Sequence, residues 1–359
     1  MACLWSCFGA LEDPRAGNAC HRLGDLLVMM IAASLCGATT ATEFALFAAE
    51  RKGVLSRLID YERAPSHDTF SRLLRLLDAR GFAEAFARFA EGFARALAVH
   101  GEGAAAAVVA LDGKALRRAH EAGCAASPPL VVSVFAAEAR LCLGVAAPER
   151  RDNEIERALH VVQMIDLTDK IVTADALHCH HRMAAAITEK GGDYVLALKG
   201  NRHGWLATAK AAFAGDCLSA ETRERSHGRD EWRRAEVVAA APLMQGHKAF
   251  IRITARRGQA KPVTRFYMAS ALLPPEDALA VARSHWMVEN GLHWMLDVHF
   301  DEDMSRARKD HAPANLAILT RLARNILQLA DKPPVPISHR IKKCNWNDDY
   351  LLTAFTHMR

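Results

Sequence analysis

Apolar residues recur at helical spacing through the first hundred residues. The clearest segment is PSHDTFSRLLRLLDARG at 65–81, where Ser66 is a typical N-cap and Gly81 a typical helix end. Its apolar stripe consists of Phe70, Leu73, Leu74 and Leu77. This 3–4-residue period predicts an all-helical N-terminal region over residues 1–100.

Short helices joined by tight turns fit two architectures. The commoner one is a plain helical bundle, which here would serve dimerisation. The other is a helix-turn-helix reader, in which Thr69, Arg72 and Arg75 would face DNA. The pattern leaves both possibilities open.

The pattern changes after the small residues GEGAAA at 101–106. Short apolar runs, typical of strands, follow at 108–111, 130–135, 141–145, 171–174 and 194–198. Helical patterns at about 153–165 and 180–190 separate the later runs. Three close strands followed by strand–helix alternation predict an α/β core with a mixed sheet, which we place at 107–330.

Residues 223–270 alternate between polar and apolar positions and have basic turns, a pattern that is typical of strands. We therefore expect a β-rich, basic insertion at about 215–270. Helical spacing returns in two long segments, at about 278–299 and 315–329. A C-terminal tail at 331–359 begins with the linker DKPPVP.

The composition excludes disordered and fibrous classes, because 51% of residues are apolar and 24% are charged. The longest apolar run, 26–36, is about half of the ~20 residues that span a bilayer. The N-terminus has no basic, apolar secretory pattern. The nine cysteines form no CxxC pair, which favours reduced thiols. We expect a cytoplasmic protein with no membrane contact.

Positive charge is concentrated in the second half of the chain. Residues 1–200 carry 22 basic and 24 acidic side chains, whereas residues 201–359 carry 24 and 17. The segment 223–265 alone holds 11 basic and 4 acidic side chains. This local excess suits a polyanion such as a nucleic-acid backbone, although a solvated basic face is an equal alternative.

Two acidic residues end apolar strands. Asp112 follows VVAL and Asp175 follows IVTA. Strand ends are exposed at a sheet edge, where α/β folds place their sites. Either residue alone is more often a turn or cap residue, but as a pair they could hold Mg²⁺ with a substrate phosphate.

A third carboxylate could come from the predicted helix at 278–299. Four of its polar residues are spaced four apart and share one face: His285, Glu289, His293 and Asp297. This face could meet solvent or the sheet edge. If it meets the sheet edge, three carboxylates could hold two ions for phosphoryl displacement.

Two other features carry weaker alternatives. The run His178-Cys179-His180-His181 has zinc-binding side chains, but four adjacent residues cannot converge on one ion. Trp232, in the basic insertion, could stack on an unpaired base or could pack under its own hairpin.

The order of several short motifs is more specific than any one of them. These are PSHDTF at 65–70, LDGK at 111–114, TADA at 173–176, GDYVLALKGN at 192–201, and HW with EN within 285–290. With them, the chain resembles the DDE transposases of bacterial insertion sequences, in the branch that includes the H-repeat-associated proteins. The resemblance covers nearly the whole chain.

The resemblance implies a ribonuclease-H-like core with catalytic, metal-binding residues Asp112, Asp175 and Glu289. It also implies Mg²⁺ or Mn²⁺ as cofactor, with two ions expected. Relatives with a wider signature carry Arg four residues before Glu and Lys seven after, but His285 and Leu296 stand there. Glu302 and Asp303 are alternatives for the third acid. Glu154 is an accessory carboxylate or, more commonly, a helix-start acid.

We expect phosphates to be positioned by Lys114, Lys199, Arg229 and Arg283. The predicted function is DNA transposition: metal-dependent cleavage at element ends, then strand transfer into target DNA. The predicted partners are double-stranded DNA and a second copy of the chain, in the nucleoid. Two alternatives are an inactive remnant that still binds DNA, and a metal-dependent nuclease without strand transfer.

Overall fold

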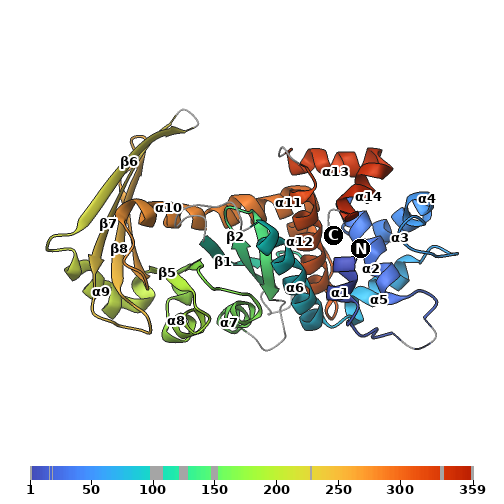
Figure 1. Cartoon of the computed structure of the whole chain (residues 1–359), viewed down its shortest axis with the longest axis horizontal. Helices are drawn as coiled ribbons and strands as arrows, with labels where there is room; N and C mark the ends of the chain where they lie inside the picture. Colours follow the sequence, from blue (N-terminus) through green and yellow to red (C-terminus); the bar gives the residue numbers. More distant parts are fainter. Residues whose placement is uncertain are drawn as a thin grey trace.

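The structure is a computed structural model that describes residues 2–15, 17, 19–97, 108–120, 128–146, 153–226, 229–331 and 335–356. One nine-stranded mixed sheet runs through it in the order β3-β2-β1-β4-β5-β9-β8-β7-β6 (Figure 1). The strands are β1 (Val108–Ala115), β2 (Leu130–Ala136), β3 (Leu141–Ala146), β4 (Ile171–Ala174), β5 (Asp193–Leu198), β6 (Leu218–Ser226), β7 (Arg229–Ala239), β8 (Ala249–Arg257) and β9 (Val263–Ala269). The predicted mixed α/β architecture is confirmed.

The first five strands form the half of the sheet that positions the candidate site. β2 pairs antiparallel with β1 and β3, whereas β1, β4 and β5 are parallel neighbours. Alternate side chains of β1 enter different cores. Val109 and Leu111 pack with α7 (Glu154–Met164) and α8 (His181–Thr188), while Val108 packs with α10 (Pro275–His285). Helices therefore cover both faces of these strands.

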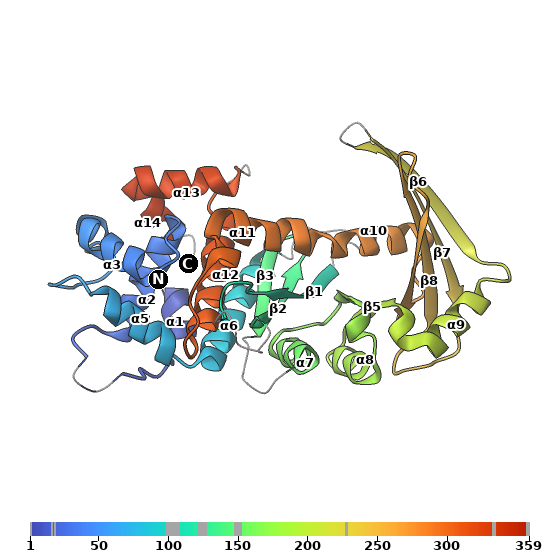
Figure 2. The same ribbon diagram turned by 180° about the vertical axis from the view of Figure 1, so that it is seen from behind.

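The region predicted to be rich in β-structure extends this same sheet. β9 pairs antiparallel with β5, and β8, β7 and β6 follow in antiparallel order. The 3₁₀ turn η2 (Gly200–Arg202) and α9 (His203–Ala212) lie between β5 and β6. In Figures 1 and 2 the strands β6–β8 project from one end of the molecule, away from both chain termini.

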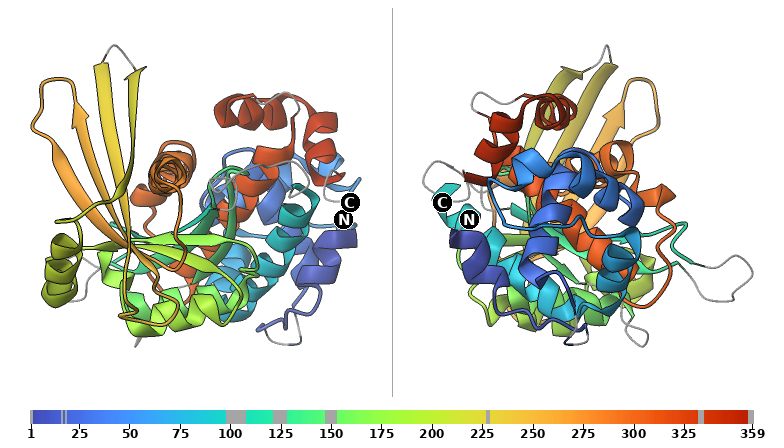
Figure 3. Two further views of the ribbon diagram at one scale, coloured as in Figure 1. Left: turned by 60° about the vertical axis from the view of Figure 1, so that its left-hand side comes forward. Right: turned by 90° about the vertical axis from the view of Figure 1, so that its right-hand side faces the viewer.

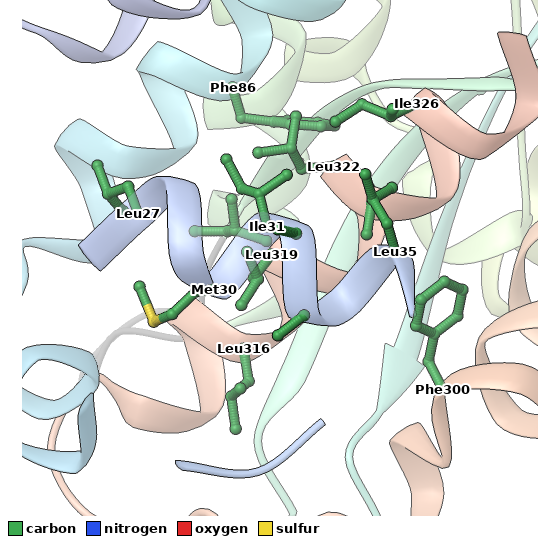
Figure 4. Close-up of a cluster of buried hydrophobic side chains, with 14 of the residues drawn as sticks. Leu27, Met30, Ile31, Leu35, Phe86, Phe300, Leu316, Leu319, Leu322 and Ile326 are labelled. Carbon is green, nitrogen blue, oxygen red and sulfur yellow. The ribbon is translucent and has the colours of Figure 1, made fainter. Parts of the chain in front are cut away.

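Helices form the other end of the molecule. They are α1 (Ala2–Phe8), α2 (Leu23–Leu35), α3 (Ala41–Glu50), α4 (Lys52–Leu55), α5 (His67–Leu76), α6 (Ala79–Leu97), α12 (Ala312–Leu329), α13 (Ile337–Trp346) and α14 (Asp348–Thr356). Figure 4 shows Ile31 of α2, Phe86 of α6 and Leu319 of α12 in one apolar cluster. The first hundred residues and the last fifty thus share a core. No helix in the described ranges has the length and apolarity that a membrane span requires.

The helix predicted at 65–81 is α5, which begins after Ser66 as expected but ends at Leu76, and Gly81 lies within the next helix, α6. α5 is bound into this bundle. Ser66 caps it by accepting from the Thr69 N–H at 3.4 Å. On α12, Asn315 donates to the carbonyls of Leu74 and Leu77, both at 2.8 Å. Arg75, one of the residues considered for DNA reading, pairs with Asp310 at 2.8 Å.

The prediction of one uninterrupted helix over 278–299 is wrong. The segment consists of α10, a π-helical turn η3 (Glu289–His293) and α11 (Trp294–Phe300), followed by the 3₁₀ turn η4 (Glu302–Met304). Figure 3 shows this segment nearly end-on beside the sheet. The π turn contains Gly291, whose backbone lies so close to Phe135 that an added Cβ would be 3.1 Å from the ring.

Asn325 of α12 closes the β3 edge of the sheet. Its side chain accepts from the Cys142 N–H at 2.9 Å and donates to the Cys142 carbonyl at 2.7 Å. β3 is the terminal strand, so these backbone groups have no partner strand. Unpaired edge groups are costly when buried.

We expect Asn325→Leu to lower the free energy of unfolding by about 2–3 kcal/mol, because two buried backbone groups lose their partners. Denaturant unfolding measures this. Gln328→Ala, on the same helix, is the control and should stay within about 0.5 kcal/mol of the parent. Equal stability of the two variants would contradict the role of Asn325.

Candidate active site

Asp112 lies within β1, at the edge of the central strands. Leu111, just before it, is paired with Ala174 of the parallel strand β4. Asp112 itself is opposite Ser133 of β2. Its Oδ1 accepts from the Gly113 N–H at 2.9 Å, so Oδ2 remains for other partners.

Asp175 follows directly on β4. Because Leu111 and Ala174 are in register, Asp112 and Asp175 occupy adjacent positions just past the last paired residues of β1 and β4. β4 ends there as predicted, but β1 continues beyond Asp112 to Ala115 because it still pairs with β2. Asp175 is also the N-cap of the 3₁₀ turn η1 (Ala176–His178), and its Oδ1 accepts from Leu177 N–H at 2.9 Å. Asp175 is thus a helix cap through Oδ1, and its other carboxylate oxygen, Oδ2, remains for other partners.

The electrostatics of Asp112 show which groups face it. Burial raises the pKa of Asp112 to about 6, and the Gly113 N–H opposes this rise. Three nearby carboxylates raise the pKa further: Asp175, Glu289 and Glu154. Like charges that surround a buried carboxyl disfavour its ionised form. Asp175, Glu289 and Glu154 thus lie near enough to Asp112 for their charges to act on it.

Two histidines of the α10–α11 segment face the sheet edge, whereas Glu289 on the same segment is exposed to solvent. His285 Nδ1 is 3.0 Å from Thr173 Oγ1 on β4. His293 Nδ1 is 3.5 Å from Asp112 Oδ2. Burial lowers the pKa of His293 to about 3, and Arg321 and Lys114 reinforce the effect. His293 is accordingly a neutral neighbour of Asp112.

The π turn that carries Glu289 has its own support. Arg324 of α12 donates from Nη2 to the Gly291 carbonyl at 2.8 Å. The Arg324 guanidinium also lies over the Phe135 ring, 5.2 Å from its centroid. A π turn shifts the hydrogen-bond register of a helix and is often found at functional sites. Here a buried arginine supplies a donor to it.

Lys114 points into the protein, although we expected it to contact phosphate. Its side chain is 8% exposed. Its Nζ is 2.7 Å from Asp297 Oδ1, 2.6 Å from Asp303 Oδ1 and 3.7 Å from Glu302 Oε2. The charge of Lys114 is thus compensated within the chain, and it ties β1 to the segment after the π turn.

Glu302 and Asp303, the alternatives for the third acid, are both held by cations. Glu302 Oε1 is 2.5 Å from Arg321 Nη1, and both side chains are buried. Asp303 contacts Lys114 and Arg117, the latter at 3.4 Å. Neither acid is among the charges that raise the pKa of Asp112. Of the three acids considered, Glu289 alone is.

The other expected phosphate contacts lie at the surface. Lys199 is exposed, just after β5, and its charge contributes to the lowered pKa of His285. Arg283 of α10 is half-exposed and pairs with Glu224 of β6 at 2.6 Å. Arg229 begins β7, but its side chain lies outside the described residues.

Carboxylate oxygens are the donors that Mg²⁺ prefers, so the acids at the sheet edge suit this ion chemically. In the described ranges, no three His, Cys, Asp or Glu side chains converge closely enough to enclose a metal ion. A magnesium site needs only one or two carboxylates when substrate phosphates complete its shell. The donor set therefore fits a cation that is bound together with DNA.

The His-Cys-His-His run diverges, as its spacing predicted. His178 faces Glu154, His180 accepts from the Met183 N–H at 3.2 Å, and His181 packs on Trp205. In the basic strands, Trp232 donates from Nε1 to Glu221 at 3.1 Å.

Comparisons with known proteins show the family of this chain. Residues 104–326 match the family described as "Transposase DDE domain", and residues 5–90 match "DDE_Tnp_1-associated". The chain belongs to the DDE transposase family. The first match includes Asp112, Asp175 and Glu289 within its bounds.

Similar proteins carry transposase names. "Putative transposase YncI" of Escherichia coli O157:H7 is 28% identical over 93% of this chain and 89% of its own length. "H repeat-associated putative transposase YhhI" of Escherichia coli K12 is 28% identical over 93% and 92%. A chain of the piggyBac transposase synaptic complex with hairpin DNA has a TM-score of 0.45 at 10% identity, covering 99% of this chain and 75% of that one.

Sequence reasoning missed several residues of this DDE transposase that support the site. Arg321 donates to Glu302 and, from Nε, to Ser133 at 2.9 Å. Arg324 supports the π turn, and His178 contacts Glu154. A signal for the arginines was present, since two arginines interrupt the otherwise apolar helix LAILTRLARNIL. No comparable signal marks His178.

Lys114→Met should lower the free energy of unfolding by about 2–4 kcal/mol, because it leaves partly buried carboxylates without their cation. Arg117→Met removes an exposed partner of Asp303, so it should cost less than about 1 kcal/mol. Chemical denaturation of both variants tests this. A Lys114 variant as stable as the Arg117 variant would show that the inward ion pairs contribute little.

Asp112→Asn should stabilise the metal-free protein at pH 8. The folded pKa of Asp112 is raised to about 6, so its ionised form costs stability. This cost is absent below about pH 4, develops between pH 4 and 6, and is full above that range. The gain at pH 8 should be about 2–3 kcal/mol and should vanish near pH 4. Unfolding curves at both pH values measure it.

Asp216→Asn, an exposed substitution, serves as the control for net charge. A gain from Asp112→Asn that is the same at pH 4 and pH 8 would contradict the electrostatic explanation.

Proposed function

We propose that this chain is an active transposase that cuts DNA at the ends of its own element and joins the freed 3′ ends to target DNA. The carrying observation is that Asp112 and Asp175 occupy adjacent positions on neighbouring strands, with Glu289 among the charges that raise the pKa of Asp112. The family gives the reaction class.

The strand order supports a ribonuclease-H-like reading of the core. Three antiparallel strands, β3-β2-β1, continue into the parallel strands β4 and β5. In this reading β6–β9 are the insertion, whose many basic residues would approach DNA. The two strand-end acids then lie on the two central neighbours, β1 and β4.

Asp112, Asp175 and Glu289 would hold Mg²⁺ or Mn²⁺, with two ions expected. A bound divalent cation would supply activation of the attacking water or 3′ hydroxyl and stabilisation of the leaving oxygen. His293, neutral beside Asp112, would add no charge to this site.

Lys199, Arg229 and Arg283 would position phosphates; Lys199 lies just after β5, Arg229 begins β7 and Arg283 lies on α10. Lys114 has no part in this proposal, since its charge is already taken by carboxylates. Two element ends must be cut and joined together, so a homodimer is expected. The place of action would be the nucleoid of the cytoplasm.

The test uses purified protein, a duplex carrying the repeat that flanks its gene, and Mg²⁺ or Mn²⁺. We expect cutting at the repeat end and joined products, both lost in Asp112→Asn, Asp175→Asn and Glu289→Gln. Glu276→Gln, an exposed acid in the first turn of α10, is the matched control and should keep both reactions. Gel analysis of labelled strands separates cut from joined DNA.

Three other outcomes would overturn parts of the proposal. Free cut ends without joined products would indicate a nuclease. DNA that is bound but intact with either metal would indicate an inactive remnant. Cutting that persists only in Glu289→Gln would remove this residue from the catalytic set.

A further inference from the structure

Glu154 reaches the candidate site although it is distant from the three acids in sequence. It is the first residue of α7. A Cβ built on Gly113 would lie 2.7 Å from Glu154 Oε1. The carboxylate end of Glu154 therefore lies close to the backbone of the residue that follows Asp112. Glu154 is also one of the charges felt by Asp112.

A buried histidine faces this carboxylate from the other side. His178 is 1% exposed, and its Nε2 is 3.4 Å from Glu154 Oε1. Its Nδ1 is buried and has no hydrogen-bond partner. The tautomer with hydrogen on Nε2 can donate to Glu154, which leaves Nδ1 as a bare acceptor.

The position of His178 depends on the second acid of the site. His178 ends the 3₁₀ turn η1, which Asp175 caps through its side chain. Its backbone N–H donates to the Asp175 carbonyl at 3.2 Å. Contacts thus connect Asp175 to His178, His178 to Glu154, and Glu154 to the backbone beside Asp112.

A helix-start role alone does not account for this arrangement. The N-terminus of α7 is capped by Asn153, which accepts from the Glu156 N–H at 3.0 Å. Glu156 supplies a second acid in the same turn and pairs with Arg182 on the surface, at 2.7 Å. Favourable interaction with a helix dipole requires an acid near the N-terminus; it does not require contact with a buried histidine.

We propose that Glu154 is a fourth carboxylate of this site that helps to hold the divalent cation, and that His178 is the positioning residue that fixes the orientation of the Glu154 carboxylate. This inference rests on the proposed function. Outer hydrogen-bond partners of metal-binding carboxylates commonly set the orientation of the carboxylate and the affinity of the site.

The first experiment measures Mn²⁺ binding to the full-length chain by calorimetry and by the electron paramagnetic resonance of free Mn²⁺, with and without duplex DNA. Glu154→Gln should weaken Mn²⁺ binding by about tenfold or more. Glu156→Gln removes the neighbouring helix-start acid, so it is the matched control and should bind like the parent. Melting temperatures of both variants report any loss of helix stability separately.

The second experiment tests the positioning role. His178→Leu should weaken Mn²⁺ binding by about 10–100-fold, because the donor to Glu154 is lost. His178→Gln places an amide donor near the Nε2 position, so it should restore much of the affinity. Rescue by glutamine and not by leucine is a result that a role in packing alone would not give. If the leucine variant does not fold, the comparison of Mn²⁺ binding by Glu154→Gln and Glu156→Gln still tests the role of Glu154.

The outcomes separate this inference from the proposed function. If the parent binds no Mn²⁺ with DNA present, the proposed metal site itself fails. If the parent binds Mn²⁺ and Asp112→Asn does not, but Glu154→Gln and Glu156→Gln bind alike, the metal site stands and the role of Glu154 is overturned.

Discussion

Two buried arginine charges on α12 require partners, and the groups that satisfy them hold the candidate site in place. Arg321 and Arg324 are fully buried, where an unpaired charge would be very costly. Arg321 is satisfied by Glu302, which also faces Lys114 on the strand of Asp112. Arg324 is satisfied partly by the carbonyl of Gly291 within the π turn. One helix thereby connects the strand that carries the first acid to the turn that carries the third.

The need to compensate buried charge also divides the acids into two groups, those that are paired with cations and those that surround Asp112. Asp297, Glu302 and Asp303 have cations within 4 Å, and they serve as internal counter-charges. The dominant charges around Asp112 are other carboxylates. Such repulsion lowers the stability of the metal-free fold, and a sequence selected only for stability would remove it. A bound cation would relieve this repulsion, which is consistent with the proposed metal site.

The local patterns predicted the positions of the strands in the first half of the sheet well. Asp112 and Asp175 each follow an apolar run, and parallel pairing at a sheet edge then follows from the fold class. The interruption at Glu289 was not predictable, since a π turn has no sequence signature and depends on the contact of Gly291 with Phe135. The inward orientation of the Lys114 side chain could not be predicted from the sequence either, because its partner Asp303 is 189 residues away. Long-range charge pairing is a property of the assembled fold and leaves little local trace.

The shared core at the helical end also constrains when the site can form during synthesis. Phe44 and Phe86 near the start of the chain pack in the same cluster as Cys344 and Phe355 near its end. A ribosome encloses the most recently made residues of a chain, so this cluster cannot close until Phe355 has left the ribosome. The helix α12, which supports the acids, is part of the cluster. A nascent chain would therefore hold its carboxylates unassembled until the helices after α12 have been made and released from the ribosome.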